Sequence, residues 1–188
     1  MFVRERRAVV ATGLIAGLAI TASVTSCSAP QKETKQAVLQ IGAIPDQNPE
    51  KLNRLYGTLS AELSEKLDVP VRYAPVSNYA AAVSAFRTGS LDLVWFGGLT
   101  CVQARLQTPG ARVLAQRDID AEFTSVFIAN GASGLRPFTS GDQLVELKGR
   151  RLAFGSESST SGRLMPQFFM GENGVKPEDL AGGGPGFS

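Results

Sequence analysis

Stretches of strand length alternate with stretches of helical period from Val38 onward, and this alternation narrows the choice of fold more than any other feature. Residues 38–44 form an apolar run that ends at Pro45 and predicts a first strand. Asn48 then offers an N-cap, with Pro49 at the first helical position. Strand followed by helix is the repeating unit of a parallel α/β sheet, so we expect this fold class. The helix should bury one face that carries Leu52, Leu55, Tyr56, Leu59, Leu63 and Leu67.

The same order continues through the next 85 or so residues. Residues 71–74 predict a second strand, and Ser77 or Asn78 caps a second helix that ends at Gly89. Residues 91–96 are nearly all apolar, as in a strand that is buried on both faces. A short helix over 99–106 and strands over 113–115 and 125–129 follow. The inner face of the second helix should carry Tyr79, Ala82, Val83 and Phe86.

A segment rich in Gly, Ser and Pro, residues 130–139, predicts the crossing into a second lobe. We therefore place a first α/β lobe at 37–130 and a partial second lobe at 131–188. The second lobe should contain a short helix over 142–147, a strand over 151–154, and a hydroxyl-rich loop leading into a helix that Gly174 ends. One strand and two helices are not expected to bury a second core, so we expect this lobe to be truncated at its C-terminus.

The N-terminus has the pattern of a lipoprotein signal peptide, which we place at residues 1–27. Arginines precede an apolar run over 8–24, and Ser26 and Cys27 follow it. Cys27 would carry the lipid, residues 28–36 would form a flexible tether, and the protein would sit on the outer face of the cytoplasmic membrane, in the periplasm or at the cell surface. The alternative is a signal anchor or a cleaved export peptide without lipid. Cys101 would then be unpaired and buried, with no disulfide.

Composition excludes several classes of function. The chain has no His, and its two Cys do not suffice for a thiolate metal cage, so we expect no metal, no cofactor and no enzyme that depends on imidazole. The net charge of +2 is spread over 19 basic and 17 acidic residues without a basic stripe. Nucleic acid is therefore not an expected partner.

The candidate site lies in the loop over 155–162. Here a predicted strand leads through a hydroxyl-rich loop into a helix. The first turn of such a helix places unpaired backbone N–H groups and the positive end of the helix dipole close together. The hydroxyls of Ser159, Thr160 and Ser161 would join them around a small oxyanion. The alternative is that these residues only cap the helix.

Other candidates follow the predicted strands of the first lobe, where ligands of open α/β sheets bind. They are Asp46, Asn78, Tyr79, Trp95 and Phe96. The alternatives are a core position for Tyr79, Trp95 and Phe96, and a capping or solvated role for Asp46. An enzyme on the same scaffold is disfavoured, because the candidate donors are neutral and stabilise an anion without attacking it.

Four ordered motifs carry a family resemblance: Asn78-Tyr79, residues 89–97, residues 147–154, and Ser159-Thr160-Ser161-Gly162. With them the chain resembles the phosphate, phosphite and phosphonate-binding family of ABC-transporter substrate-binding proteins. The resemblance implies a two-lobed periplasmic-binding-protein fold of type II, with parallel or mixed sheets. It also implies a monomer that delivers an oxyanion to a permease and its ATPase. Ser159, Thr160 and Ser161 would hold the anion, with Tyr79 on the opposite lobe.

The position of Phe96 departs from the family pattern, because phosphonate binders can have Tyr there. Residues 41–47, 50–56 and 95–99 further resemble a subgroup described as selenate binders. A selenate or other oxyanion binder, and a ligand-sensing module of a signalling system, therefore stand as alternatives to a transport protein for phosphorus oxyanions.

Overall fold

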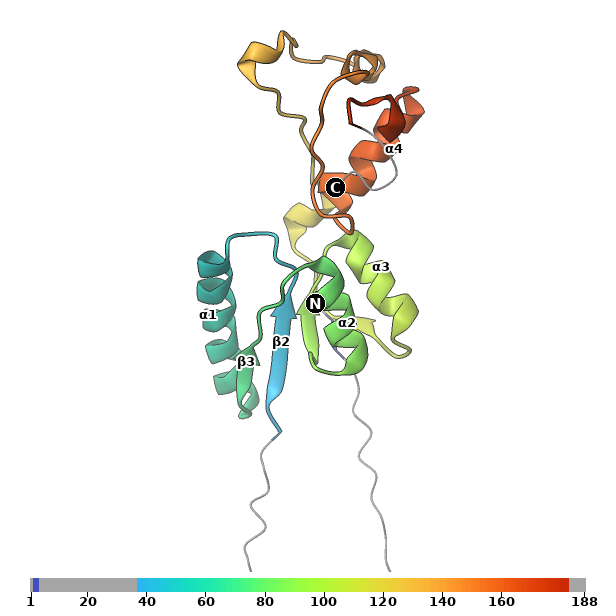
Figure 1. Ribbon diagram of the computed structural model, residues 1–188. Coiled ribbons are helices and arrows are strands. Elements are labelled where there is room, and N and C mark those ends of the chain that lie inside the picture. Colours follow the sequence, from blue (N-terminus) through green and yellow to red (C-terminus); the bar gives the residue numbers. More distant parts are fainter. Residues whose placement is uncertain (1, 4–36, 183–188) are drawn as a thin grey trace, which may run out of the picture.

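The computed structural model describes residues 2–3 and 37–182. They form two bodies joined by a narrow waist (Figure 1). We call the body that contains the sheet and helices α1 to α3 the first lobe, and the body that contains α4 the second lobe. The predicted lipid site at Cys27, the tether over 28–36 and nearly all of the predicted signal peptide lie outside the described residues. The exact division of the chain at residue 130 stays a prediction.

A five-stranded sheet with the order β3-β2-β4-β1-β5 forms the centre of the first lobe. Strands β2 (Leu39–Ala43), β3 (Val71–Tyr73) and β4 (Leu93–Trp95) are parallel, and Ile41 lies between Tyr73 and Leu93 in the register. The two-residue strand β1 (Phe2–Val3) pairs antiparallel with both β4 and β5 (Arg112–Val113). The predicted α/β fold with a mixed sheet is confirmed, whereas strand β1 was not predicted.

Helices cover both faces of this sheet, and their ends follow local sequence signals. Helix α1 (Pro49–Leu67) begins where the Asn48 side chain accepts a hydrogen bond from the Lys51 amide at 2.8 Å. Helix α2 (Tyr79–Thr88) ends at Gly89, whose φ of 79° is left-handed. Helix α3 (Gly98–Gln107) follows β4 directly. The predicted helix starts and stops are confirmed.

The core of the first lobe has two parts, one on each face of the sheet. Val94 packs with Phe86 of α2 and Ala104 of α3, whereas its neighbour Leu93 packs on the other face with Leu59 of α1. This alternation is the two-residue period of a strand. Cys101 is only half-buried against the first cluster, and burial raises the pKa of its thiol.

Three predictions about residues 37–130 are wrong wholly or in part. Leu55 and Leu67 of α1 are 49% and 51% exposed, whereas Leu52 of the same predicted stripe is buried. Residues 125–129 form no strand and are exposed. The strand predicted at 113–115 is replaced by the shorter β5, which also starts one residue earlier.

The second lobe has few regular elements but does have a small core. Its elements are η2 (Gly131–Ser133), η3 (Gly141–Leu147), η4 (Thr160–Leu164), α4 (Met165–Glu172) and η5 (Pro177–Asp179). The strand predicted at 151–154 is absent. The expectation that this segment buries no core is wrong, because a separate cluster forms from Leu144, Leu147, Met170, Val175 and Leu180.

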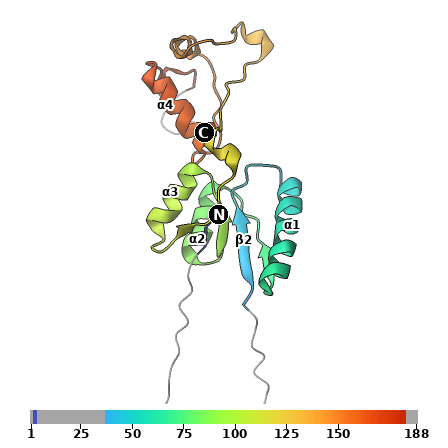
Figure 2. The same ribbon diagram turned by 180° about the vertical axis from the view of Figure 1, so that it is seen from behind.

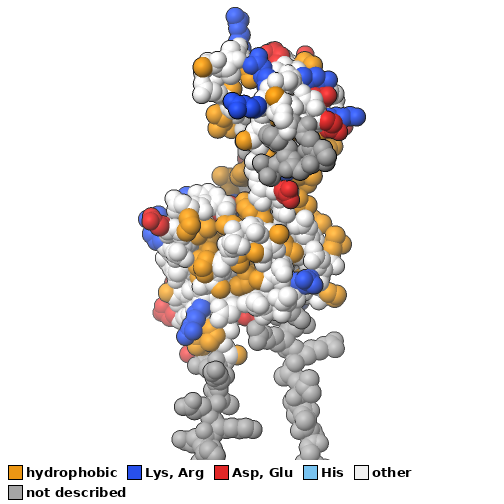
Figure 3. Space-filling model, in the orientation of Figure 1, with side chains coloured by type: hydrophobic (Ala, Val, Ile, Leu, Met, Phe, Trp, Pro, Cys, Tyr) orange, Lys and Arg blue, Asp and Glu red, His pale blue; other side chains and the backbone are white. Residues whose placement is uncertain are grey.

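Charged side chains are dispersed over the face seen in Figure 3, without a large patch of one sign. Within 2–3 and 37–182, no helix has the length and apolar character needed to cross a bilayer. The same residues contain no cluster of three or more His, Cys, Asp or Glu side chains arranged to hold a metal ion.

Candidate functional site

The carboxyl edge of the parallel strands faces the second lobe (Figure 1). Asp46 follows β2, Trp95 ends β4, and helices α2 and α3 begin at this edge with Tyr79 and Gly98. Parallel pairing places these segments together, because all carboxyl ends of parallel strands meet at one edge. The structure therefore brings the first-lobe candidates to the junction between the lobes.

Thr160 joins the second lobe to the start of α3. The Leu99 amide donates a hydrogen bond of 2.7 Å to Thr160 Oγ1. The N-cap residue of α3 is Gly97, which has no side chain to cap the helix, so Thr160 supplies the cap from the other lobe. Gly98 permits this approach, because a Cβ there would lie 3.1 Å from Thr160 Oγ1. The starts of α3 and η4 thus face each other.

Ser159 is buried and connects the helix of the second lobe to Tyr79 of the first. Its hydroxyl accepts a hydrogen bond from the Gly162 amide at 3.0 Å and so caps η4. The pKa of Tyr79 is raised, first by burial and then by the Asp46 carboxylate, while a hydrogen bond with the Ser159 side chain lowers it. The net shift is upward, so Tyr79 stays a neutral hydrogen-bond donor at physiological pH.

The loop that carries these hydroxyls is held by backbone contacts on both sides. The Gly155 amide donates to the Gly162 carbonyl at 2.8 Å, and a Cβ on Gly155 would lie only 3.1 Å from the Gly162 Cα. Ser125 Oγ donates to the Ser161 carbonyl at 2.9 Å. The strand expected before this loop is therefore not needed to fix its shape.

The sequence predicted hydroxyls and amides that the protein itself leaves unpaired, and here the structure differs. The Ser159 and Thr160 hydroxyls each accept a hydrogen bond from a backbone amide. The physical reason is that helix-start amides take the nearest oxygen when no other acceptor is present. The capping role is therefore observed for both residues, and their role in holding an anion stays a prediction.

Two other candidates have clear local roles. Asn78 is exposed and caps α2, with its side-chain oxygen accepting from the Ala81 amide at 2.8 Å. Phe96 packs edge-to-face on Phe86, with ring centroids 5.7 Å apart, and belongs to the core of the first lobe. Asp46 is exposed. Burial raises the pKa of Tyr56, Tyr73 and Tyr79, the three tyrosines of the chain, and the Asp46 carboxylate adds to each shift.

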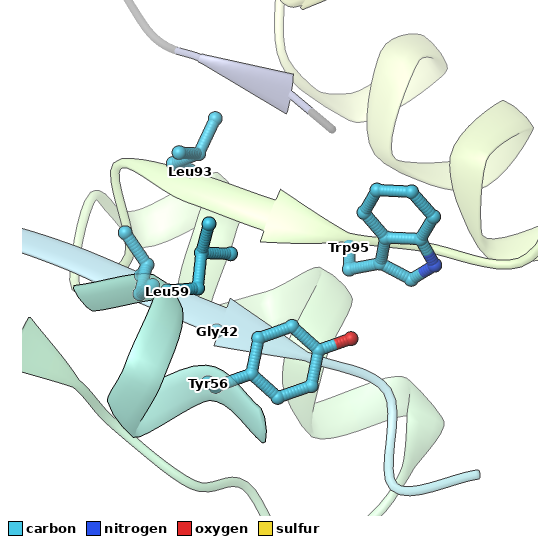
Figure 4. A pocket seen from close by; sticks show the side chains of 6 residues that line it. Gly42, Tyr56, Leu59, Leu93 and Trp95 are labelled. Carbon is cyan, nitrogen blue, oxygen red and sulfur yellow. The ribbon is translucent and has the colours of Figure 1, made fainter. Parts of the chain in front are cut away.

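Trp95 is half-buried and lines a small apolar cavity beneath α1 (Figure 4). The hydroxyl end of Tyr56 is directed toward the side of this cavity where Trp95 lies. The lining is mostly apolar and has no charged side chain, so this cavity is less suited to an anion than the hydroxyls and amides around Thr160. It is lined by Ile41, Gly42, Tyr56, Leu59, Leu93 and Trp95.

The sequence analysis did not find Arg117. Its guanidinium carbon lies 5.3 Å from the centroid of the Trp95 ring. Asp120 holds the same group, with Nη2 to Oδ1 at 2.6 Å and Nε to Oδ1 at 3.1 Å. No motif surrounds Arg117, and 21 residues separate it from Trp95 in the chain, so only the fold reveals the contact.

Comparison with known proteins yields a consistent set of matches. A family model described as the periplasmic substrate-binding protein of phosphonate ABC transporters matches residues 41–187. The probable ABC transporter phosphite binding protein PhnD1 of Prochlorococcus marinus (strain MIT 9301) is 55% identical over 151 residues, which cover 80% of this chain and 51% of the relative. The phosphonates-binding periplasmic protein of Escherichia coli (strain K12) is 26% identical over 174 residues, 89% of this chain and 51% of the relative.

A solved structure of the P. marinus PhnD1 in complex with methylphosphonate superposes with a TM-score of 0.78. The sequence identity is 55%, and the match covers 80% of this chain and 56% of that one. This chain spans about half the length of the curated relatives it matches.

Proposed function

Because the chain belongs to the family of periplasmic substrate-binding proteins of phosphonate ABC transporters, we propose that it binds a phosphorus oxyanion where its two lobes meet. The ligand is a phosphonate, phosphite or phosphate, which the protein delivers to an ABC permease and its ATPase. Members of this family are transport proteins, so the protein binds and releases its ligand and is not an enzyme. Its fold is that of the periplasmic binding proteins.

The observation that carries this proposal is the bond between the Leu99 amide and Thr160 Oγ1. It aligns two helix starts, one from each lobe, around a single oxygen atom. An oxyanion between them accepts from the Leu99 amide in place of Thr160, and the Thr160 hydroxyl rotates to donate to the same ligand. The dipole of the ten-residue helix α3 favours the negative charge at this end.

Tyr79 adds a donor from the first lobe. Its phenol is neutral at physiological pH because its pKa is raised, so it donates to an anion rather than repelling it. It already lies within hydrogen-bond contact of Ser159, so both groups reach one ligand with small side-chain shifts. Ligand contacts from both lobes favour the closed arrangement of the hinge.

Calorimetric titration tests this function on protein with the full length of its relatives. Methylphosphonate, phosphite, phosphate, sulfate and selenate form the panel. We expect the tightest binding for one of the phosphorus oxyanions. Tightest binding of selenate would replace the proposed ligand class, and no binding of any of the five would contradict an oxyanion receptor.

We also propose that the protein is anchored to the outer face of the cytoplasmic membrane through a lipid on Cys27. The basic start, the apolar run and the Ser26-Cys27 pair support this site. Replacing Cys27 with Ser should move the protein from the membrane fraction to the soluble fraction, whereas the control Cys101→Ser should leave it on the membrane. Retention of the Cys27→Ser protein after a carbonate wash would contradict the lipid anchor. That the protein acts as a monomer stays a prediction.

A further inference from the structure

Arg117 lies immediately before η1 (Asp118–Ala121), a short turn at the waist between the lobes (Figures 1 and 2). Its guanidinium stacks over the Trp95 ring at 5.3 Å. Trp95 in turn is the last residue of β4, two positions before the glycines that approach Thr160. Arg117 therefore contacts the residue from which the backbone leads into the glycines beside Thr160.

Asp120 fixes Arg117 in this position. The carboxylate accepts from Nη2 at 2.6 Å, from Nε at 3.1 Å and from the Arg117 backbone amide at 3.2 Å. This fork orients the plane of the guanidinium, which a point charge such as that of Lys does not achieve. The geometry is that of a cation placed over the face of an aromatic ring.

We infer that Arg117 is a positioning residue of the oxyanion site: it holds the Trp95 ring at the lobe junction. This inference rests on the proposed function. The arginine acts through Trp95, with Asp120 as its support.

The alternative is that the ion pair of Arg117 and Asp120 only stabilises the turn in which both residues lie. The side chains of Arg117 and Asp120 are 52% and 26% exposed, and pairs exposed to this degree contribute little to folding. The chain offers a matched control in the exposed pair of Lys66 and Glu62 on α1, which lies at 3.2 Å and away from Trp95. Loss of Arg117 and loss of Lys66 should therefore affect stability to a similar small extent but affect binding differently.

The test compares Arg117→Gln, Arg117→Lys, Asp120→Asn and the control Lys66→Ala, with methylphosphonate and phosphite as probes. We expect Arg117→Gln to weaken binding about tenfold, since the Trp95 ring loses its cationic partner. Arg117→Lys should recover part of the affinity, because an ammonium still attracts the face of the ring but lacks the planar fork that Asp120 orients. Asp120→Asn should lie between the unaltered protein and Arg117→Gln, and Lys66→Ala should bind normally.

Fluorescence of Trp95 separates positioning from a purely structural role. In the ligand-free protein, Arg117→Gln should make Trp95 more accessible to acrylamide, while its thermal midpoint stays close to that of Lys66→Ala. A Trp95→Phe protein supplies the background signal. Binding by Arg117→Gln within twofold of the unaltered protein, or unchanged quenching of Trp95, would overturn the inference. If the unaltered protein binds no probe, the proposed function fails, whereas the quenching result still decides whether Arg117 holds the ring.

Discussion

The hydroxyl of Thr160 has one observed use and one proposed use, and the two compete. It accepts the Leu99 amide of the other lobe at 2.7 Å, and in the proposed function it turns to donate to an oxyanion. A hydroxyl is suited to this exchange, because it has one donor and two lone pairs on a single rotatable atom. The atom that joins the lobes is therefore also the proposed donor to the ligand.

Replacing Thr160 with Val tests this role while preserving the shape of the side chain. We expect oxyanion binding to weaken by roughly 1–3 kcal/mol, because a hydrogen bond to a charged ligand is lost. Thr160→Ser, which keeps the hydroxyl, should retain most of the affinity. Calorimetry measures both, and equal affinity of the Val protein and the unaltered protein would return Thr160 to a capping role alone.

Residue-level predictions succeeded where the signal was local. Ser159 and Thr160 stand at a helix start, and their hydroxyls do lie at the lobe junction. The partners of these hydroxyls were not predictable, because Leu99 is 61 residues from Thr160. Arg117 was missed for the same reason, since its contact with Trp95 exists only after the chain folds.

At the scale of elements, Asn78 shows how a site candidate can be a structural residue. Its side-chain oxygen accepts from the Ala81 amide, so we expect Asn78→Ala to destabilise the protein by about 1 kcal/mol through loss of the α2 cap. Asn78→Ser keeps a capping oxygen and should be close to neutral. Urea denaturation measures the effect. Oxyanion affinity should change little in either variant, and a large loss of affinity in both would show that Asn78 contacts the ligand.

Helices of the first lobe were predictable because their signals lie within the helix or beside it. Asn48 with Pro49 marks the start of α1, and Gly89 marks the end of α2. The strands predicted at 125–129 and 151–154 failed because a strand needs a partner elsewhere in the chain. Residues 125–129 have the apolar composition of a strand, yet Val126 and Ile128 are 78% and 88% exposed.

At the scale of the whole molecule, the Asp46 carboxylate influences three elements at once. Burial raises the pKa of Tyr56 on α1, Tyr73 on β3 and Tyr79 on α2 above 10, and Asp46 adds to each shift. A pKa that is higher in the folded than in the unfolded protein stabilises the fold fully below the unfolded value of about 10. We therefore expect stability to fall as the pH rises above about 10, when the unfolded chain loses protons that the folded protein retains.

Ultraviolet titration of tyrosinate checks this effect. Asp46→Asn should lower the pKa of all three tyrosines and extend the stable range further into alkali, because the gap between folded and unfolded pKa values narrows, while Glu178→Gln in the second lobe serves as the control. Because burial is the larger cause, each pKa should remain above 10 in the Asp46→Asn protein. Unchanged titration in that variant would show that Asp46 does not face the tyrosines.

The fold class could be predicted from the sequence, but the core of the second lobe and strand β1 could not. Alternation of strand and helix patterns indicated the α/β sheet, and the sheet exists with its parallel centre. The core of the second lobe was not predicted, because Leu144 and Val175 come from segments without a clear hydrophobic periodicity. Strand β1 was not predicted, because it lies within the predicted signal peptide.

The link between Leu99 and Thr160 means that the protein carries its own competitor for the oxyanion that we propose it binds. In that proposal an arriving oxyanion exchanges one acceptor for another, so its net gain in free energy is smaller than its contacts alone suggest. Affinity should consequently depend on the strength of this one internal bond, whose two atoms are also the proposed donors to the ligand.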